Sequence, residues 1–436
     1  MRESPIFSYI APLEGTVSTS GMTRQNFRII IVGGGIAGIA AAIALRKEGR
    51  EILVLEKSRM LGEVGALISL QPNASKIASL WNLDNILASS KPVVDTELRI
   101  LDTDSNVIRR IPSNTAIYGA ERVVYHRQDL HLALVEAATS IDRPGDPVKI
   151  WTSSPVVRCD PVRGSITLKN GEELEADLVV GADGIRSIVR ESVLEKPVES
   201  MPTGLSAYRI LIDTNKIGDL PVSKDIFDIQ RPATTIVMGH DCRVVLGPGR
   251  GHETLGIVAL LPDDRLNEIS HGGSWTSQGS LNKLLESFAN FPPWLLQIFQ
   301  SAPDIGLWQL RDIGPLGEWV KGRTIIIGDA AHAMLPTQGQ GASQSFEDAE
   351  ALGAFFANVT DQASLDTVNA TLKDIFNARY ERATLIQQYS RQQAKPATEK
   401  DSKIITLRPD EFMDYNCQYS GIKDWIAKNA SELSCI

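Results

Sequence analysis

A glycine-rich segment near the start of the chain has the spacing needed to bind the phosphates of a dinucleotide. Gly33-Gly34-Gly35-Ile36-Ala37-Gly38 matches GxGxxG between an apolar, β-branched run and an alanine-rich stretch. The first glycine allows a tight turn, the second lets the backbone approach a pyrophosphate, and the third lets helix and strand pack closely. The N-terminus of the following helix attracts phosphate charge. The motif alone does not distinguish NAD from FAD.

Acidic residues follow three of the expected strands. Glu56 comes after the run Glu51–Leu55, about 20 residues beyond the glycines, where a carboxylate accepts hydrogen bonds from ribose hydroxyls. Asp183 follows the run Asp177–Val180 in a DG motif, Asp183-Gly184. Asp329 follows Thr324–Ile327 in a GD motif, Gly328-Asp329. Since doubly wound sheets bind ligands outside the carboxyl ends of their strands, we expect these acids to lie at one site.

Histidines and cysteines indicate no second kind of site. The six histidines show no HxH or HExxH spacing, and the four cysteines include no CxxC pair, so we predict no metal. Four reduced thiols are typical of a reducing compartment, so we expect a cytoplasmic protein.

The elements that must position these acids form two patterns. Phe27–Val32, the helix beginning at Ile36 and Glu51–Leu55 form a βαβ unit, which predicts a parallel sheet. Residues 200–310 instead contain short alternating strands separated by Gly and Pro, which predicts an inserted, mostly antiparallel sheet. The expected organisation is a disordered tail (1–26), an FAD- or NAD-binding α/β domain in two parts (27–199 and 311–395), a substrate-binding sheet (200–310) and a C-terminal helical segment (396–436).

Composition limits the class of protein. The apolar fraction is 43%, the charged fraction is 22% and the net charge is −9, which favours a globular protein and argues against nucleic-acid binding. No apolar run is long enough to be a transmembrane segment. The first 26 residues lack the features of a signal peptide, and Met22 is an alternative start.

The three motifs, in this order and spacing, resemble those of the single-component FAD-dependent monooxygenases. They are most similar to the salicylate-hydroxylase-like aromatic hydroxylases of fungi and bacteria, from about Phe27 to Tyr389. The resemblance implies a Rossmann-like FAD-binding domain with an inserted substrate sheet and C-terminal helices. It also implies that NADH or NADPH reduces FAD and that a flavin C4a-hydroperoxide transfers one oxygen atom from O2. The implied substrate is an aromatic, alkaloid-like or other electron-rich small molecule, in secondary metabolism. We expect a monomer or homodimer.

The resemblance also assigns cofactor-binding residues by position. Arg127 would reach the phosphate and ribityl region, and Asp183 would sit near the pyrophosphate. Asp329 would bond the ribityl chain, and Gly339–Gly341 would lie beside the isoalloxazine ring. For Glu347 and Asp348, a capping or solvated role is at least as plausible as contact with the cofactor. The full set is Gly33, Gly35, Ile36, Ala37, Gly38, Glu56, Lys57, Arg127, Asp183, Asp329, Pro336, Gly339, Gln340, Gly341 and Ala342.

Three further positions, His332, Thr337 and Leu67, are compared with the corresponding positions of the family. His332 resembles a position that is usually structural, so we do not expect it to be a base. Thr337 stands where salicylate-type members have a histidine that serves as a base, which argues against salicylate as the substrate. Leu67 replaces a glycine of the family, and either reshapes the flavin environment or fills a gap.

Tyr208 and Arg209, in the inserted sheet, are the predicted catalytic residues. An arginine there would hold a carboxylate or phenolate with two bonds, although a tie between sheet and FAD domain is equally plausible. His240 and His252 are lesser candidates for contact with the substrate. Two alternatives to hydroxylation stay open: epoxidation, dearomatisation or reduction on the same fold, and a non-catalytic flavoprotein.

Overall fold

The structure is a computed structural model that describes residues 26–59, 66–266, 276–394, 405 and 407–433. The predicted N-terminal tail and the alternative start at Met22 lie outside the described residues. No helix in these ranges is long and apolar enough to cross a membrane.

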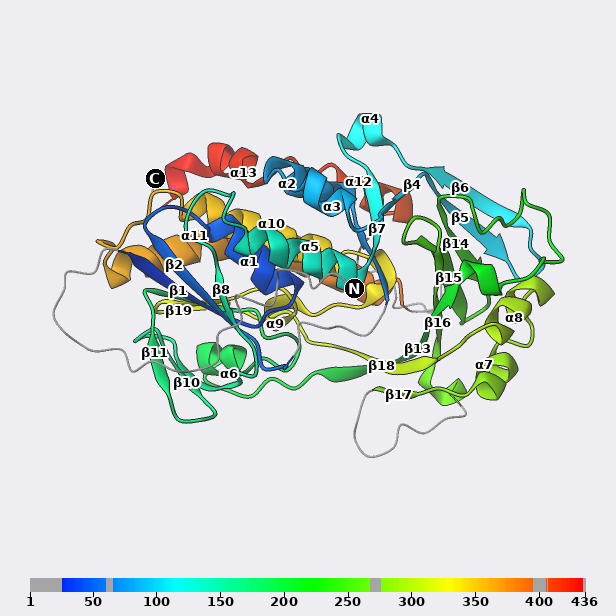
Figure 1. Cartoon of the computed structure of the whole chain (residues 1–436), viewed down its shortest axis with the longest axis horizontal. Helices are drawn as coiled ribbons and strands as arrows, with labels where there is room; N and C mark the ends of the chain where they lie inside the picture. Colours follow the sequence, from blue (N-terminus) through cyan, green and yellow to red (C-terminus); the bar gives the residue numbers. More distant parts are fainter. Residues whose placement is uncertain (1–25, 60–65, 267–275, 395–404, 406, 434–436) are drawn as a thin grey trace.

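A six-stranded sheet forms the core of the larger part of the molecule (Figure 1). Its order is β19-β20-β12-β1-β2-β8, with β19 and β20 antiparallel and the other neighbours parallel. The strands are β19 (Val320–Lys321), β20 (Thr324–Ile326), β12 (Leu178–Gly181), β1 (Phe27–Val32), β2 (Arg50–Leu55) and β8 (Lys149–Trp151). The central strands are nearly continuous apolar runs because both faces of the sheet are covered. The predicted parallel sheet is confirmed.

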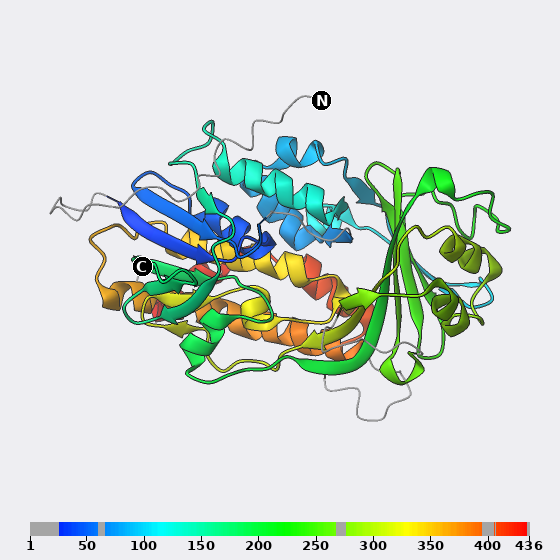
Figure 2. The same cartoon turned by 60° about the horizontal axis from the view of Figure 1, so that its bottom comes forward.

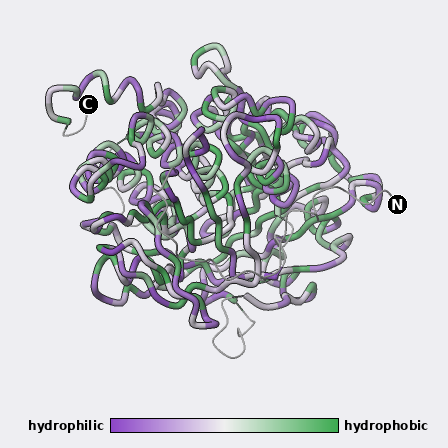
Figure 3. The backbone as a smooth tube through the Cα atoms, turned by 60° about the vertical axis from the view of Figure 1, so that its left-hand side comes forward, coloured by the Kyte–Doolittle hydropathy of each residue, from purple (hydrophilic) through white to green (hydrophobic). Residues whose placement is uncertain are grey.

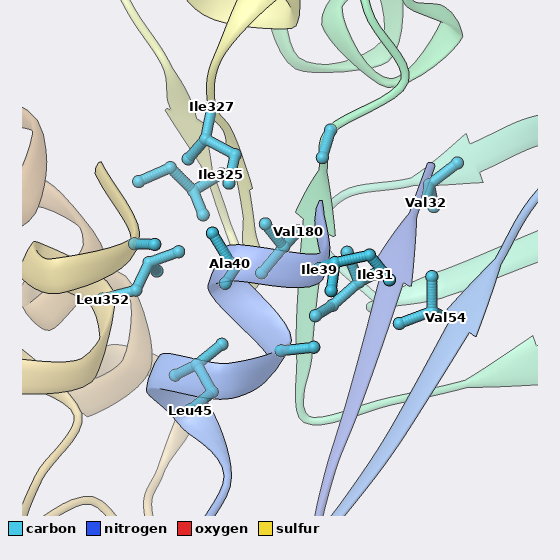
Figure 4. Packing of buried hydrophobic residues seen from close by; sticks show 14 of the residues in the cluster. Ile31, Val32, Ile39, Ala40, Leu45, Val54, Val180, Ile325, Ile327 and Leu352 are labelled. Carbon is cyan, nitrogen blue, oxygen red and sulfur yellow. The ribbon is translucent and has the colours of Figure 1, made fainter. Parts of the chain in front are cut away.

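Small residues let helices pack closely on one face of this sheet. Helix α1 (Ile36–Leu45) contacts β1 and β2 on one side and α10 (Gly341–Phe355) on the other. A Cβ atom on Gly353 would stand 2.8 Å from the Ala44 carbonyl oxygen, so the two helices are in close backbone contact. Figure 4 shows Ile39 and Ala40 of α1 packed among strand residues and Leu352 of α10. Full burial of a side chain such as Ile39 stabilises the fold by about 1.5–3 kcal/mol, which fixes the start of α1 at the sheet edge.

An eight-stranded sheet occupies the other end of the molecule (Figures 1 and 2). Its order is β17-β18-β13-β16-β15-β14-β5-β6. The strands are β17 (Thr276–Gln278), β18 (Gly306–Asp312), β13 (Met201–Asp213), β16 (Thr254–Pro262), β15 (Arg243–Gly249), β14 (Ala233–Met238), β5 (Glu97–Asp102) and β6 (Val107–Pro112). The predicted antiparallel insert is present, but β5 and β6 come from the segment that we assigned to the first part of the cofactor domain. Strand β5 joins through a parallel pairing with β14, and no local turn signal marks such a long-range pair.

The two faces of this sheet have different neighbours. One face packs against α7 (Leu281–Ser287) and α8 (Pro293–Gln300), in a cluster that includes Tyr208, Phe288 and Trp294. The other face carries Ala207 and Leu260, which pack with Leu335 from the cofactor domain. We call this second face the cleft face. Since side chains alternate along a strand, Arg209 shares the cleft face with Ala207.

Smaller elements complete the fold. Their strands are β3 (Leu67–Leu70), β7 (Arg122–His126) and β4 (Val93–Asp95), and β9 (Val156–Asp160), β10 (Ser165–Leu168) and β11 (Glu173–Glu175). Their helices are α2 (Pro72–Leu80), α3 (Asp84–Ala88), α4 (Thr115–Tyr118), α5 (Arg127–Thr139), α6 (Ile188–Leu194), α9 (Asp329–His332), α11 (Leu365–Gln392), α12 (Pro409–Cys417) and α13 (Ile422–Asn429). Hydrophobic and hydrophilic stretches alternate along most of the tube in Figure 3, as expected for elements that bury one side.

The turn between β15 and β16 ties the eight-stranded sheet to the cofactor domain. Arg250 donates to both carboxylate oxygens of Asp129 on α5, at 2.6 and 2.8 Å, and lies 3.1 Å from His126 Nδ1. Gly251 N donates to the Lys91 carbonyl at 2.8 Å. Arg250 and His252 both have positive φ, +48° and +72°, so the turn holds two non-glycine residues in the left-handed region. These contacts fix the cleft face against the start of α5.

Candidate cofactor and substrate site

The GxGxxG turn has the geometry that a pyrophosphate needs. Gly33 has φ +108°, and a Cβ there would stand 2.3 Å from the Ala182 carbonyl oxygen. A Cβ on Gly38 would stand 1.9 Å from the Gly33 carbonyl oxygen. A Cβ on Gly35 would instead meet no atom within 4 Å, so this backbone faces open space at the start of α1. The first and third glycines therefore serve packing, and the second leaves room for a ligand.

Side chains from two other elements hold this turn in place. Glu56, at the end of β2, accepts a hydrogen bond from Gly34 N at 2.8 Å and another from Ser58 N at 2.8 Å. His131 Nε2 lies 2.6 Å from the Gly34 carbonyl oxygen and is buried in α5. Lys57 is exposed beside Glu56. Our sequence analysis missed His131, because only the fold brings α5 beside the turn.

The two aspartates at strand ends have different surroundings. Asp183 accepts hydrogen bonds from Ser187 Oγ and from the backbone N–H groups of Ile188 and Val189, at 2.8 and 3.2 Å for the latter two. Both of its oxygens are therefore engaged in holding the start of α6. Burial raises its pKa, although these hydrogen bonds oppose the shift. Asp183 therefore supports the shape of its loop, and its place near the pyrophosphate stays a prediction.

Asp329 differs from Asp183 in its exposure. It is exposed at the first position of α9. Its charge raises the pKa of Arg127, although burial lowers that pKa overall. Gly328, just before it, has φ +56°, and a Cβ there would stand 2.7 Å from Ala37 Cβ. The GD turn therefore packs directly on the start of α1, beside the GxGxxG turn, as predicted for motifs at one edge of a parallel sheet.

The Gly339–Gly341 turn presents the start of α10 to the same region. Gly339 has φ +61°, and a Cβ there would stand 3.4 Å from Ser69 Oγ on β3. A Cβ on Gly341 would meet no atom within 4 Å, and no side chain caps α10. Pro336 is exposed before the turn, and Ala342 is the second residue of α10. Helix α1 also begins without a side-chain cap. Two uncapped helix N-termini attract anions, such as a pyrophosphate or a reduced flavin.

Beneath this turn lies a buried polar cluster, which we call the α10 network. Arg379 donates to Glu347 at 2.5 Å, to Asp348 at 3.0 Å and to Gln344 at 2.6 Å. The Gln340 side chain joins through Asn73, which donates to Gln340 at 3.0 Å and to Glu347 at 2.7 Å. All six residues of the network are almost completely buried: Asn73, Gln340, Gln344, Glu347, Asp348 and Arg379. The capping or solvated role that we considered for Glu347 and Asp348 is therefore wrong.

Asp348 also links this network to the GD turn. Its Oδ2 atom accepts from Gly328 N at 2.9 Å and lies 2.7 Å from His332 Nε2. Burial would raise the pKa of Asp348, but His332 and Arg379 hold it well below its usual value. His332 is thus a buried partner of Asp348, in agreement with the structural role that we expected. Asn73 and Arg379 carried no sequence signal, because their partners are distant in the chain.

Arg209 and Arg127 bring two positive charges together between the eight-stranded sheet and the start of α5. Arg209 lies on the cleft face, 4.7 Å above the ring of Trp308. Burial lowers the pKa of Arg209, and the charge of Arg127 lowers it further. Arg127 opens α5, and its N–H donates to the Ala66 carbonyl at 2.8 Å. Among the described residues, no carboxylate forms an ion pair with Arg209. Two desolvated cations in this position favour an anionic ligand.

The other predicted substrate-side residues do not share this place. Tyr208 is fully buried in the cluster under α7 and α8, because successive side chains of β13 point to opposite faces. The prediction that Tyr208 is catalytic therefore lacks structural support. His240 is exposed in the turn before β15 and His252 lies in the turn after it, so neither lies on the cleft face of a strand. Thr337 donates its hydroxyl to the Ser390 carbonyl at 2.7 Å.

Metal-binding side chains do not cluster in the part of the chain that the structure describes, where no three His, Cys, Asp or Glu residues come together. The residues present fit FAD instead. Five features match the charges of the ADP and flavin halves of FAD. They are the open Gly35, the ordered Glu56 beside the turn, the uncapped starts of α1 and α10, and Arg127.

Comparisons with known proteins agree with this geometry. A family model described as an FAD binding domain matches residues 309–382, and one described as an NAD(P)-binding Rossmann-like domain matches residues 31–68. Hispidin-3-hydroxylase of Neonothopanus nambi is 30% identical over 371 residues, which cover 82% of this chain and 87% of the relative. The FAD-dependent monooxygenase cfoG of Aspergillus candidus is 32% identical over 379 residues, covering 84% and 85%.

A solved structure has the same fold. A salicylate hydroxylase in complex with its substrate matches with a TM-score of 0.71 at 23% identity, covering 87% of this chain and 92% of that one. The predicted fold class, the FAD cofactor and the enzyme class are confirmed, and the family uses NAD(P)H. This chain belongs to the FAD-dependent monooxygenases of the aromatic-hydroxylase type.

Proposed function

We propose that this enzyme hydroxylates a small aromatic molecule that binds as an anion, with NAD(P)H as electron donor and O2 as oxygen source. The observation that carries the proposal is Arg209, a desolvated cation on the cleft face with no carboxylate paired to it among the described residues. When bound, FAD supplies the redox chemistry that consumes NAD(P)H and activates O2.

Different residues of the cofactor domain would bind different parts of FAD. The Gly33–Gly38 turn and the start of α1 would bind the pyrophosphate, and Glu56 would accept from ribose hydroxyls while Gly34 and Ser58 keep it in place. Arg127 would add a positive charge on the phosphate and ribityl side, and Asp329 would bond the ribityl hydroxyls. The open backbone at Gly341 and the start of α10 would stabilise negative charge on the ring system.

Arg209 would orient the substrate. Its guanidinium lies against Trp308, which restricts the plane in which it donates hydrogen bonds. A guanidinium stays charged even with a lowered pKa, and it holds a carboxylate or phenolate with two parallel bonds. Where the held group is a phenolate, its negative charge keeps the ring electron-rich. The elements around the cleft would exclude water while oxygen is transferred.

Thr337 does not act as a base that removes a proton from the substrate. Threonine is a poor base, and the Thr337 hydroxyl is already donating to the Ser390 carbonyl. We therefore propose that the substrate is ionised before the reaction, which suits a benzoate or an acidic phenol better than a neutral phenol. A part in secondary metabolism is supported by the fungal origin of several relatives. We retain the proposal of a monomer or homodimer.

Substitution of Arg209 tests this proposal. Arg209→Lys should lower kcat/KM for substrate-stimulated NAD(P)H oxidation by on the order of ten-fold, about 1.4 kcal/mol, because lysine lacks the planar pair of donors. FAD content should be unchanged. Arg110→Lys, on the exposed edge strand β6 of the same sheet, is the matched control and should change neither quantity. Loss of FAD from the Arg209 variant would instead identify a structural tie.

Product analysis distinguishes the remaining reaction types. A hydroxylated product formed in step with NAD(P)H consumption supports the proposal. Hydrogen peroxide without product would indicate a reductase, and a non-aromatic product would indicate epoxidation or dearomatisation.

A further inference from the structure

The cleft face of the eight-stranded sheet contains a patch without side chains. Gly247 and Gly256 are cross-strand partners on β15 and β16, and Gly249 lies two residues further along β15. None of the three has a positive φ, so backbone conformation does not require glycine at these positions. Glycine weakens a strand interior and typically marks a close approach by another group.

Leu67 is the group that approaches. A Cβ on Gly249 would stand 2.5 Å from Leu67 Cδ2, and a Cβ on Gly256 would stand 2.5 Å from Leu67 Cδ1. The leucine therefore lies directly on the backbone of two adjacent strands. It belongs to β3, which is part of the cofactor domain, so this contact joins the two domains across the cleft.

The register of the strands places Leu67 among the groups proposed to bind flavin and substrate. Leu67 pairs with His126, the residue before Arg127. Ser69, on the same face of β3, is the residue beside Gly339. Across the cleft, Gly256 pairs with Leu211, which follows Arg209 by two residues and points to the same face. Leu67 thus lies over β15 and β16, and β16 is the strand that pairs with the Arg209 segment of β13.

We propose that Leu67 determines the size of substrate that this enzyme accepts. Its half-buried side chain fills the space above the glycine patch and forms an apolar wall on the sheet face that also carries Arg209. This inference rests on the proposed function, since it assumes that Arg209 orients the substrate. Leu67→Ala would leave a void on the order of 100 Å³ above the glycine patch, room for an added alkyl group on the ring of a bound substrate.

A graded series of ligands tests the proposal. The probes are hydroxybenzoates that carry hydrogen, methyl, ethyl or propyl at one ring position. Binding to the FAD-loaded protein is followed by the change in flavin absorbance, and turnover by product formation. Leu67→Ala should raise the ratio of affinity for the propyl member to affinity for the unsubstituted member by about ten-fold or more over wild type. Leu70→Ala is the matched control, because Leu70 is buried on the opposite face of β3. It should lower stability and leave the ratio unchanged.

A second substitution, on β16, refills the void that Leu67→Ala leaves. Gly256→Ala in the Leu67→Ala background adds a methyl group where the leucine stood and should return the ratio toward wild type. An unchanged ratio in Leu67→Ala that retains FAD, or the absence of binding to both proteins, would overturn the proposal. If the ratio shifts in binding but no member is hydroxylated, the size determinant stands and the proposed function fails.

Discussion

Arg379→Met is the perturbation whose effect the structure predicts most fully. Arg379 is 1% exposed, and its guanidinium donates to Glu347, Asp348 and Gln344. Methionine fills much of the same volume but donates no hydrogen bond. Breaking a buried ion pair costs about 3–5 kcal/mol, because a charge is left unpaired. We expect the lower end, about 3 kcal/mol, since Arg382 still pairs with Glu347.

Thermal unfolding of the FAD-loaded protein measures this cost. At about 2 °C per kcal/mol for a chain of this size, Tm should fall by about 6 °C. FAD occupancy should fall too, because the α10 network holds both the Gly328 N–H and the Gln340 side chain. Arg163→Met is the matched control, since Arg163 is 62% exposed and pairs with an exposed Glu175, a contact worth less than about 1 kcal/mol. A Tm within 1–2 °C of this control, with full FAD occupancy, would refute the argument that the network supports the cofactor site.

Further outcomes follow from the same geometry. Gly35→Ala should lower FAD affinity by about ten-fold or more without lowering the Tm of the apoprotein. Gly38→Ala should instead destabilise the apoprotein, because its Cβ would collide with the Gly33 carbonyl. Titration with FAD and melting of the apoprotein distinguish the two effects. Arg250→Ala should lower Tm by about 2 °C through loss of its paired bonds to Asp129, and Arg250→Gly should be up to about 1 kcal/mol more stable than Arg250→Ala, because glycine accepts a positive φ without strain. The folded-state pKa of Asp348 is lowered, so its stabilisation is complete above the unfolded pKa and is lost as pH falls below about 4; wild-type Tm should drop in that range and Asp348→Asn should drop less steeply.

Local patterns in the sequence account for much of the fold and for the cofactor motifs. Phe27–Val32 and the glycines after it form a strand and a turn whose requirements lie within a few residues, so pattern alone predicts them. The pairing of β5 with β14 depends on segments far apart in the chain, and it was missed. The hydrogen bond from Ser187 to Asp183 could not be predicted either, because it depends on the conformation of the loop between them.

The candidate substrate site could be predicted only in part, because it depends on contacts between segments that are distant in the chain. Tyr208 and Arg209 were predicted together because both belong to a segment that resembles one of the family. Adjacent residues of a strand face opposite ways, and only the packing of α7 and α8 shows which face is the core. Arg379 lies on a long helix whose pattern does not reveal that its partners are two buried carboxylates. Leu67 was noticed as a departure from the family, but its contact with Gly256 is visible only once the two domains meet.

The central claim is that this FAD-dependent monooxygenase transfers oxygen from O2 to an anionic aromatic substrate. The most direct measurement is mass spectrometry of the product formed by the purified, FAD-loaded protein with NAD(P)H and a hydroxybenzoate under isotopically labelled O2. We predict a hydroxylated product that carries one labelled oxygen atom, formed in step with NAD(P)H consumption and formed about ten-fold less efficiently when Arg209 is replaced by lysine. Label found only in hydrogen peroxide, or a product whose new oxygen comes from water, would contradict it.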